Sequence, residues 1–306
     1  MIMKSQYKRG QAFIAACLLN TLLLVAYYLS RISSEDHESN KDFTDITVSY
    51  DSLLSDQLRS LVDPKQTEFK RIVFQTSSDS TKSSKWKSWS EDNGFEYRLY
   101  TDQEMEEFIR NTINIDQITM AFELMSHNVL KADFFRYLVL FYYGGLYTDI
   151  DTEPLKSWED WQSVFDDEED KASLVVGIEA DPDRIDWNDW YARRVQLCQW
   201  TILAKKGNPI LQGLVMEIVK NTLELKYTHL DDAMEWTGPG IFTDAIMNNL
   251  KIDWKTLTGL KEPKLIEDVL VLPITSFSPG VGHMGSGQLF DRVALVKHFF
   301  AGSWKN

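Results

Sequence analysis

Two aspartates one residue apart, Asp149 and Asp151, are the side chains of this sequence best suited to chemistry. They end a β-rich run, residues 146–151, that predicts a strand. Side chains alternate between the two faces of a strand, so both carboxylates should point the same way and Ile150 into the core. Neighbouring carboxylates repel each other unless a cation lies between them, and a hard divalent ion such as Mg²⁺ or Mn²⁺ prefers oxygen ligands. The pair therefore predicts a metal site with open positions for the phosphates of a substrate.

A second pair of charges, Asp133 and Arg136, lies one helical turn apart inside the apolar segment 129–143. This composition predicts a helix buried on most sides, and Gly144-Gly145 predicts its end. Charged side chains in such a helix need partners. The two residues either form a structural ion pair at i, i+3 or reach a polar ligand that lies beside the metal.

The stretch KADFFRYLVLFYYGGLYTDID, residues 131–151, resembles the donor-binding core of glycosyltransferase family 32, whose fungal members include α-1,6-mannosyltransferases of the Golgi. This resemblance implies a GT-A-type nucleotide-diphospho-sugar transferase fold, with a mostly parallel central sheet flanked by helices. It implies retaining transfer from GDP-mannose with Mn²⁺, or Mg²⁺, as cofactor. It places the donor hexose at the helix pair together with Tyr137, and the metal and diphosphate at the two strand-end aspartates. The residues to which it assigns catalysis are Asp133, Arg136, Asp149 and Asp151.

Other stretches carry the same resemblance over residues 69–306, among them FEYRLYTD, WTGP and HFFAGSWK. The last of these implies that His298 is a third metal ligand and that Ser303 and Trp304 contact the diphosphate. WTGP implies that Thr237 and Gly238 contact the donor or the acceptor. The chain departs from the family at Phe74, where a tryptophan is usual.

The elements that must position these residues alternate along the chain. Strand-like runs at 71–76 and 95–100 are each followed by a helical pattern, with Thr101 as a helix cap, which predicts a mostly parallel sheet covered by helices. Ligands bind beyond the carboxyl ends of strands in open α/β sheets. Gln75 and Thr76 therefore either line the nucleotide site or belong to an ordinary polar loop.

A further strand, residues 173–178, leads into a loop with the composition of a sugar-binding site. Aromatic rings pack against the C–H faces of sugars and carboxylates accept hydrogen bonds from their hydroxyls. The tryptophans either serve this purpose or pack in the interior. Because the stretch resembles the mannosyltransferase branch, it implies acceptor contacts. These candidate residues are Glu179, Asp181, Trp187 and Trp190.

Two other features carry expectations without a chemical role. Cys198 is expected in a helix as an inert buried thiol, unpaired with Cys17. The glycine-dense loop 279–287 lacks the spacing and lysine of a P-loop, and is either a mobile loop over the active site or a surface loop.

The N-terminal region predicts a membrane protein. Residues 11–30 form a mostly apolar run of about the length that spans a bilayer, and basic residues precede it. A cleaved signal peptide is the alternative, but the run is long and no Ala-x-Ala site follows. The expected organisation is a cytosolic tail (1–10), a signal-anchor (11–30), a lumenal stem (31–67) with a short helix near 50–61, and a catalytic domain (68–306). The expected location is the Golgi membrane, or the ER and early Golgi, as a single-pass type II protein.

The net charge of −14 over 306 residues argues against nucleic acid as a partner. The resemblance implies a glycoprotein N-glycan as acceptor, and other Golgi mannosyltransferase subunits as candidate partners. Three alternatives remain: a transferase that uses a UDP-sugar, a non-catalytic subunit of a glycosylation complex, and a lectin with Ca²⁺ at Asp149 and Asp151.

Overall fold

The structure, a computed structural model, describes residues 42–62, 68–82, 84–166, 168, 170–182, 184–282 and 284–302. The predicted anchor at 11–30 and the predicted phosphate contacts Ser303 and Trp304 lie outside these residues. Within the described part of the chain, no helix is long and apolar enough to cross a membrane.

Contacts divide the chain into two units, Met1–Leu53 and Leu54–Asn306. The helix α2 (Asp42–Ser60) extends across this division. Its later turns bury Leu54 and Leu58 in the core of the second unit, although the sequence places them in the stem. The second unit contains all the described candidate site residues.

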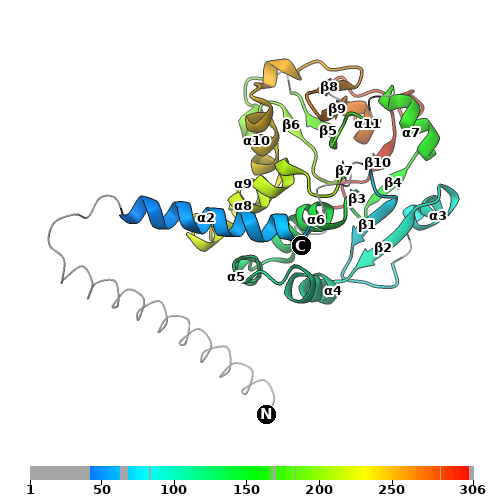
Figure 1. The fold of residues 1–306 in the computed structure, drawn as a ribbon. Helices are drawn as coiled ribbons and strands as arrows, with labels where there is room; N and C mark the ends of the chain where they lie inside the picture. The colour runs from blue at the N-terminus through cyan, green and yellow to red at the C-terminus, as the bar shows by residue number, and fades with distance from the viewer. Residues whose placement is uncertain are drawn as a thin grey trace, which may run out of the picture. The chain divides into compact units, whose positions relative to one another are not determined.

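The second unit is built on a mixed sheet in the order β2-β1-β3-β7-β5-β9-β8, with β6 paired to β5 (Figure 1). A small sheet pairs β4 with β10. The strands are β1 (Ile72–Thr76), β2 (Glu96–Tyr100), β3 (Gly145–Thr148), β4 (Thr152–Pro154), β5 (Leu174–Ala180), β6 (Gln196–Leu197), β7 (Thr201–Ala204), β8 (Lys264–Ile266), β9 (Val269–Leu272) and β10 (Val296–His298).

The prediction of a mostly parallel sheet is wrong. β1 pairs in parallel with β2 and β3, and β5 pairs in parallel with β9, but β7 runs antiparallel between β3 and β5. Parallel neighbours need a crossover connection, usually an α-helix. The described residues between β5 and β7 form only the short 3₁₀ turn Trp187–Asp189 and β6, so the chain turns back and pairs antiparallel.

Helices cover both faces of this sheet and bury a separate apolar cluster on each (Figure 1). One cluster lies under α5, α6, α8 and α10, and the other under α3, α7 and α11. The helices of this unit are α3 (Lys85–Asp92), α4 (Asp102–Glu107), α5 (Asp116–Leu124), α6 (Asn128–Tyr143), α7 (Trp158–Phe165), α8 (Pro209–Leu223), α9 (Ala233–Trp236), α10 (Pro239–Leu250) and α11 (Ile274–Phe277), with a π-helical turn at Phe108–Ile113.

The predicted buried helix and its glycine stop are confirmed in α6. Ten of its side chains are buried, and the helix ends at Gly144, whose φ is 71°. Gly145 follows with a φ of 112°, and a Cβ atom there would lie 2.7 Å from the carbonyl oxygen of Ile72. Only glycine therefore lets the chain leave α6 and enter β3 directly beside β1.

Asp149 and Asp151 lie in a turn, so the strand predicted for residues 146–151 is too long. β3 ends at Thr148, and β4 begins at Thr152. Thr152 closes the turn, because its hydroxyl and its N–H donate to the carbonyl oxygen of Asp149 at 2.6 and 3.1 Å. Ile150 is correspondingly half-buried and does not enter the core.

Cys198 is buried, as expected, but the predicted helix around it is wrong. Its N–H donates to the carbonyl oxygen of Gly177 at 2.9 Å, in the antiparallel pairing that begins with β6. The apolar positions of this segment serve a sheet, since Leu197 and Cys198 belong to the clusters on opposite faces.

Candidate metal and donor site

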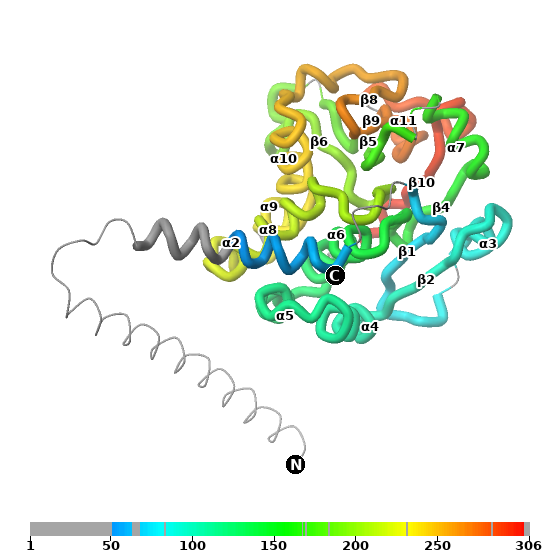
Figure 2. The backbone as a smooth tube through the Cα atoms, viewed as in Figure 1, coloured from blue at the N-terminus to red at the C-terminus, as the bar shows by residue number. Residues whose placement is uncertain are grey.

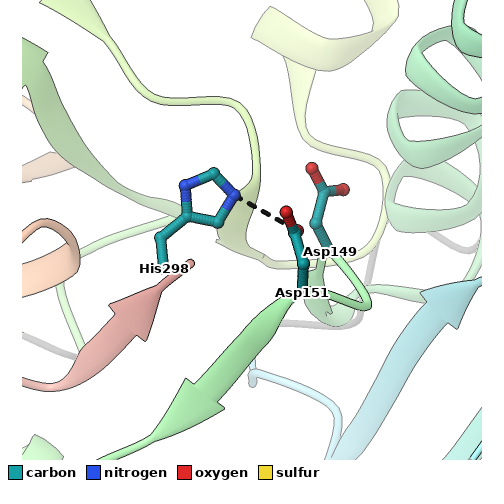
Figure 3. Close-up of side chains that lie close together, drawn as sticks. All are labelled: Asp149, Asp151 and His298. Atoms are coloured by element: carbon teal, nitrogen blue, oxygen red, sulfur yellow. Dashed lines mark hydrogen bonds and ion pairs between the residues drawn. The ribbon is translucent and has the colours of Figure 1, made fainter. Parts of the chain in front are cut away.

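The structure brings together the three residues predicted as metal ligands (Figure 3). Asp149 and Asp151 come from the β3–β4 turn and His298 from the end of β10. One ligand atom from each residue lies within 4.8 Å of the others, and the Nε2 atom of His298 is 3.2 Å from Oδ1 of Asp151. The side chains of the two aspartates are 28% and 22% exposed, so an ion from solvent reaches them.

The donor set fits a divalent cation. Two carboxylates supply hard oxygen ligands, and an imidazole suits Mn²⁺ better than Mg²⁺. Three protein ligands leave coordination positions for substrate oxygens. The chemistry of these side chains therefore agrees with a metal that also holds phosphate.

The segment 296–302 docks beside the metal ligands through its backbone. β10 pairs antiparallel with β4, which Figure 2 shows as two adjacent stretches of the tube. The N–H of Phe299 donates to the carbonyl oxygen of Asp151, and the N–H of Ala301 to its Oδ2, each at 3.0 Å. Burial works to raise the pKa of Asp151, but the hydrogen bonds from His298 and Ala301 prevail and hold that pKa below its ordinary value.

A buried chain of charges joins the metal ligands to α6. The Nη1 atom of Arg136 lies 2.7 Å from Oδ1 of Asp133, and its Nη2 donates to Oδ1 of Asp149 at 3.0 Å. Asp133 and Arg136 are each 4% exposed. Burial raises the pKa of Asp133, and the Arg136 guanidinium offsets part of this rise. The i, i+3 ion pair thus exists, and it also fixes the orientation of a predicted metal ligand.

Gln75 and Thr76 lie at the carboxyl end of β1, as expected, but Gln75 faces inward. Its side chain is fully buried, accepts a hydrogen bond from the hydroxyl of Tyr97, and donates to the carbonyl oxygen of Asp149 at 2.9 Å. Gln75 thus holds the backbone of the predicted metal-binding turn through this hydrogen bond to Asp149. Thr76 is half-buried, and its hydroxyl lies 3.1 Å from that of Tyr147.

Tyr137, Thr237 and Gly238 pack around Asp133. The hydroxyl of Tyr137 lies 2.9 Å from the carbonyl oxygen of Thr237, and the hydroxyl of Thr237 donates to Oδ2 of Asp133 at 3.3 Å. Gly238 caps α10, and a Cβ atom there would lie 2.7 Å from the carbonyl oxygen of Ala233. These three residues form the wall behind Asp133.

The predicted acceptor residues lie at the carboxyl end of β5 and in the loop 181–195. Glu179 accepts a hydrogen bond from Nε2 of Gln196 at 2.9 Å, and burial raises its pKa to about 7. Asp181 has a structural role: its carboxylate accepts hydrogen bonds from Thr258, the N–H of Gly259 and Arg194.

The two tryptophans of this loop do not pack in the core. The side chain of Trp190 is 64% exposed, and Trp187 is half-buried. The interior alternative considered for these residues is therefore wrong for Trp190, whose ring is largely exposed and has the guanidinium of Arg184 over it, 5.5 Å from its centroid.

Three residues of the site escaped the sequence analysis. Arg193 forms paired hydrogen bonds with both Glu235 and Asp244, and so ties the loop 181–195 to α9 and α10. The carbonyl oxygen of Trp200 accepts a hydrogen bond from the N–H of Asp149. The ring of Trp200 stacks on that of His298, with ring centroids 4.5 Å apart. Gln199 bonds the hydroxyl of Tyr137. No spacing in the sequence identifies them, because each acts on residues far away in the chain.

The paired aspartates with His298, beside a buried Asp–Arg pair on an α/β fold, agree with what comparisons with known proteins find. Residues 64–167 match the family described as "Glycosyltransferase sugar-binding region containing DXD motif". The chain is similar to three proteins named initiation-specific alpha-1,6-mannosyltransferase. The one from Schizosaccharomyces pombe is 53% identical over 63% of this chain and 51% of its own length. The one from Candida albicans is 44% identical over 72% and 66%, and the one from Saccharomyces cerevisiae 33% identical over 72% and 73%.

The chain belongs to this DXD-containing family, glycosyltransferase family 32. The predicted family is therefore confirmed. The chain spans about half the length of the S. pombe relative that it matches and about two thirds of the C. albicans one.

Proposed function

We propose that this protein transfers mannose, with retention of configuration, from GDP-mannose to a mannosyl acceptor on a glycoprotein N-glycan and forms an α-1,6 linkage. The observation that carries the proposal is the continuous path from Asp133 through Arg136 to the cluster of Asp149, Asp151 and His298. In this proposal the hexose would bind at Asp133 and Arg136, directly beside the metal and the diphosphate, as a GT-A-type transferase requires. The names of the three relatives supply the sugar and the linkage.

Each residue of the path has a separate task. Asp149, Asp151 and His298 would hold the divalent ion, Mn²⁺ or Mg²⁺, which when bound neutralises the charge that develops on the leaving diphosphate. Arg136 fixes the Asp149 carboxylate, and together with Asp133 it orients the hexose. This orientation lowers the entropic part of the barrier.

The acceptor would bind at the carboxyl end of β5. The strand order places β5 next to β7, and β7 next to β3, so this end lies along the same edge of the sheet as the metal-binding turn. The exposed ring of Trp190 suits the apolar face of a sugar. Glu179 keeps one carboxylate oxygen beyond its bond to Gln196 for a sugar hydroxyl.

The cellular setting belongs to the same proposal. Residues 11–30 would anchor the protein in the Golgi membrane as a type II protein, with residues 68–306 in the lumen. Its partners there would be glycoprotein N-glycans and other mannosyltransferase subunits.

Isothermal titration of the full chain in detergent tests the donor. GDP-mannose, GDP and UDP-sugars are titrated with and without Mn²⁺ into the wild type and an Asp151→Ala variant. Binding of GDP-mannose that depends on Mn²⁺ and is lost in the variant is the expected result. Preference for a UDP-sugar would overturn the donor assignment, and absence of nucleotide binding would favour a non-catalytic subunit or a lectin.

A further inference from the structure

Gln199 is the residue of this region whose contacts no assigned role explains. It lies immediately before β7, with its amide Oε1 in hydrogen-bond contact with the hydroxyl of Tyr137. Its side chain also interacts with the carboxylate of Asp133. Gln199 thus lies beside the two α6 residues that we assign to the hexose pocket.

Exposure separates Gln199 from its neighbours. Asp133 and Arg136 are each 4% exposed, and Tyr137 and Thr237 are fully buried. Gln199 is only half-buried. Among these residues, Gln199 is therefore the most accessible to a sugar that approaches from solvent.

The hydrogen bonds around Tyr137 leave Gln199 free to change partner. A phenolic hydroxyl carries one proton, and here it faces two acceptors, the carbonyl oxygen of Thr237 and the Oε1 atom of Gln199. The turn between α9 and α10 fixes the carbonyl group of Thr237. The hydroxyl of Tyr137 therefore keeps its hydrogen bond to this carbonyl when another donor bonds to Oε1 of Gln199. The Nε2 group offers two N–H donors, more than the one Asp133 carboxylate beside it requires.

The backbone around Gln199 fixes its position relative to the metal ligands. The carbonyl oxygen of the next residue, Trp200, accepts a hydrogen bond of 2.8 Å from the N–H of Asp149, and the ring of Trp200 stacks on that of His298. These contacts of Trp200 fix the backbone from which the Gln199 side chain starts, next to the predicted metal ligands. Such rigidity is what recognition of a group adjacent to the diphosphate requires.

We propose that Gln199 binds the transferred hexose directly, accepting a hydrogen bond from one sugar hydroxyl at Oε1 and donating to a second oxygen from Nε2. This inference rests on the proposed function, since it assumes that a hexose diphosphate occupies the site. It adds to the buried Asp–Arg pair a contact from outside α6, at a residue that lies 62 positions from Tyr137 in the sequence.

The test separates the sugar from the nucleotide. Dissociation constants for GDP and for GDP-mannose are measured in Mn²⁺ with the full chain in detergent, for the wild type, Gln199→Met and Gln199→Glu. The control is Gln212→Met, which removes an amide bonded to Ser55 in α2. Thermal melting of each variant shows that it is folded.

Gln199→Met should weaken GDP-mannose about tenfold, the size expected for one or two lost hydrogen bonds, and leave GDP within about twofold. Gln199→Glu keeps an acceptor but replaces the amide donor with a carboxylate beside that of Asp133, so it should weaken GDP-mannose at least as much as Gln199→Met. Gln212→Met should change neither constant.

Four results would overturn the assignment. Equal weakening of GDP and GDP-mannose would make Gln199 a structural residue, as would loss of folding in both Gln199 variants but not in the control. Unchanged GDP-mannose binding in folded variants would remove the sugar contact while leaving the proposed function intact. Failure of the wild type to bind GDP-mannose would refute the proposed donor itself, and the sugar contact with it.

Discussion

The proposed donor half of the site and the proposed acceptor half are held together by different means. Around α6 and β3, the charged residues are buried and each carboxylate or guanidinium bonds another that is also buried or half-buried. In the loop 181–195, Arg193 forms its ion pairs between side chains that are 27–43% exposed, and Trp190 is 64% exposed.

This difference corresponds to two requirements. A nucleotide-sugar donor presents fixed charges, so its site benefits from groups that do not move. An acceptor glycan presents mainly neutral hydroxyls and C–H faces. A loop that exposes aromatic side chains and is attached to the fold by a few ion pairs suits such a ligand. Substitutions should therefore affect stability most in the donor half and acceptor use most in the loop.

Arg136→Met should have the largest effect. It leaves the buried Asp133 carboxylate without its partner, so the free energy of unfolding should fall by about 3–5 kcal/mol, and transfer activity should disappear. Urea denaturation measures the first effect and a mannose-transfer assay the second. The double variant Asp133→Leu/Arg136→Met should recover at least half of the lost stability but no activity; a fully stable single variant would contradict the importance of this pair.

Glu179→Gln should change how stability depends on pH. Because burial raises the pKa of Glu179 from 4.5 to about 7, the folded protein holds a proton between these values that the unfolded chain has released. Wild-type stability should therefore fall as pH rises from 4.5 to 7, by up to about 2–3 kcal/mol from this group. The Glu179→Gln variant should lack this part of the fall in stability.

Denaturation of both proteins at pH 5, 6, 7 and 8 measures the effect of Glu179, with the exposed Glu91→Gln as control. Parallel pH curves for wild type and Glu179→Gln would show that the carboxyl ionises normally.

Arg193→Met should detach the acceptor loop. It removes the hydrogen bonds to Glu235 and Asp244, which at 27–43% side-chain exposure stabilise the fold by only about 1–2 kcal/mol. The KM for the acceptor should rise several-fold, whereas the dissociation constant of GDP-mannose should stay the same. Arg292→Met, which breaks an exposed pair with Glu262, serves as control, and an equal loss of donor binding would refute the separation of the two halves.

Trp190→Ala should have the smallest effect on stability, within about 0.5 kcal/mol, because its ring is mostly exposed. Its acceptor KM should nevertheless rise, since a sugar loses its stacking surface. Phe290→Ala, at a side chain that is 83% exposed, removes a comparable surface ring elsewhere and should change neither quantity. An unchanged acceptor KM for Trp190→Ala would exclude this ring from the acceptor site.

The sequence predicted the elements whose signals are local. The helix cap at Thr101, the apolar run of α6 and its glycine stop all act within one or two turns of the chain, and all are present. The paired aspartates were found for the same reason. The direction of β7, the turn that holds these aspartates and the strand β6 just before Cys198 were missed, because strand pairing depends on neighbours that propensity does not reveal.

The sequence alone determined which side chains have the chemistry of a metal and sugar-phosphate site, because residue type and close spacing are enough to identify Asp133, Arg136, Asp149 and Asp151. Only the tertiary structure decided which residues from distant parts of the chain contact these side chains. It places His298 against Asp151 across 147 positions and Gln199 against Tyr137. It also turns Gln75 inward, away from a ligand. These contacts result from packing over the whole sheet, where the burial of distant apolar residues, and not the preference of any short segment, fixes which polar groups meet.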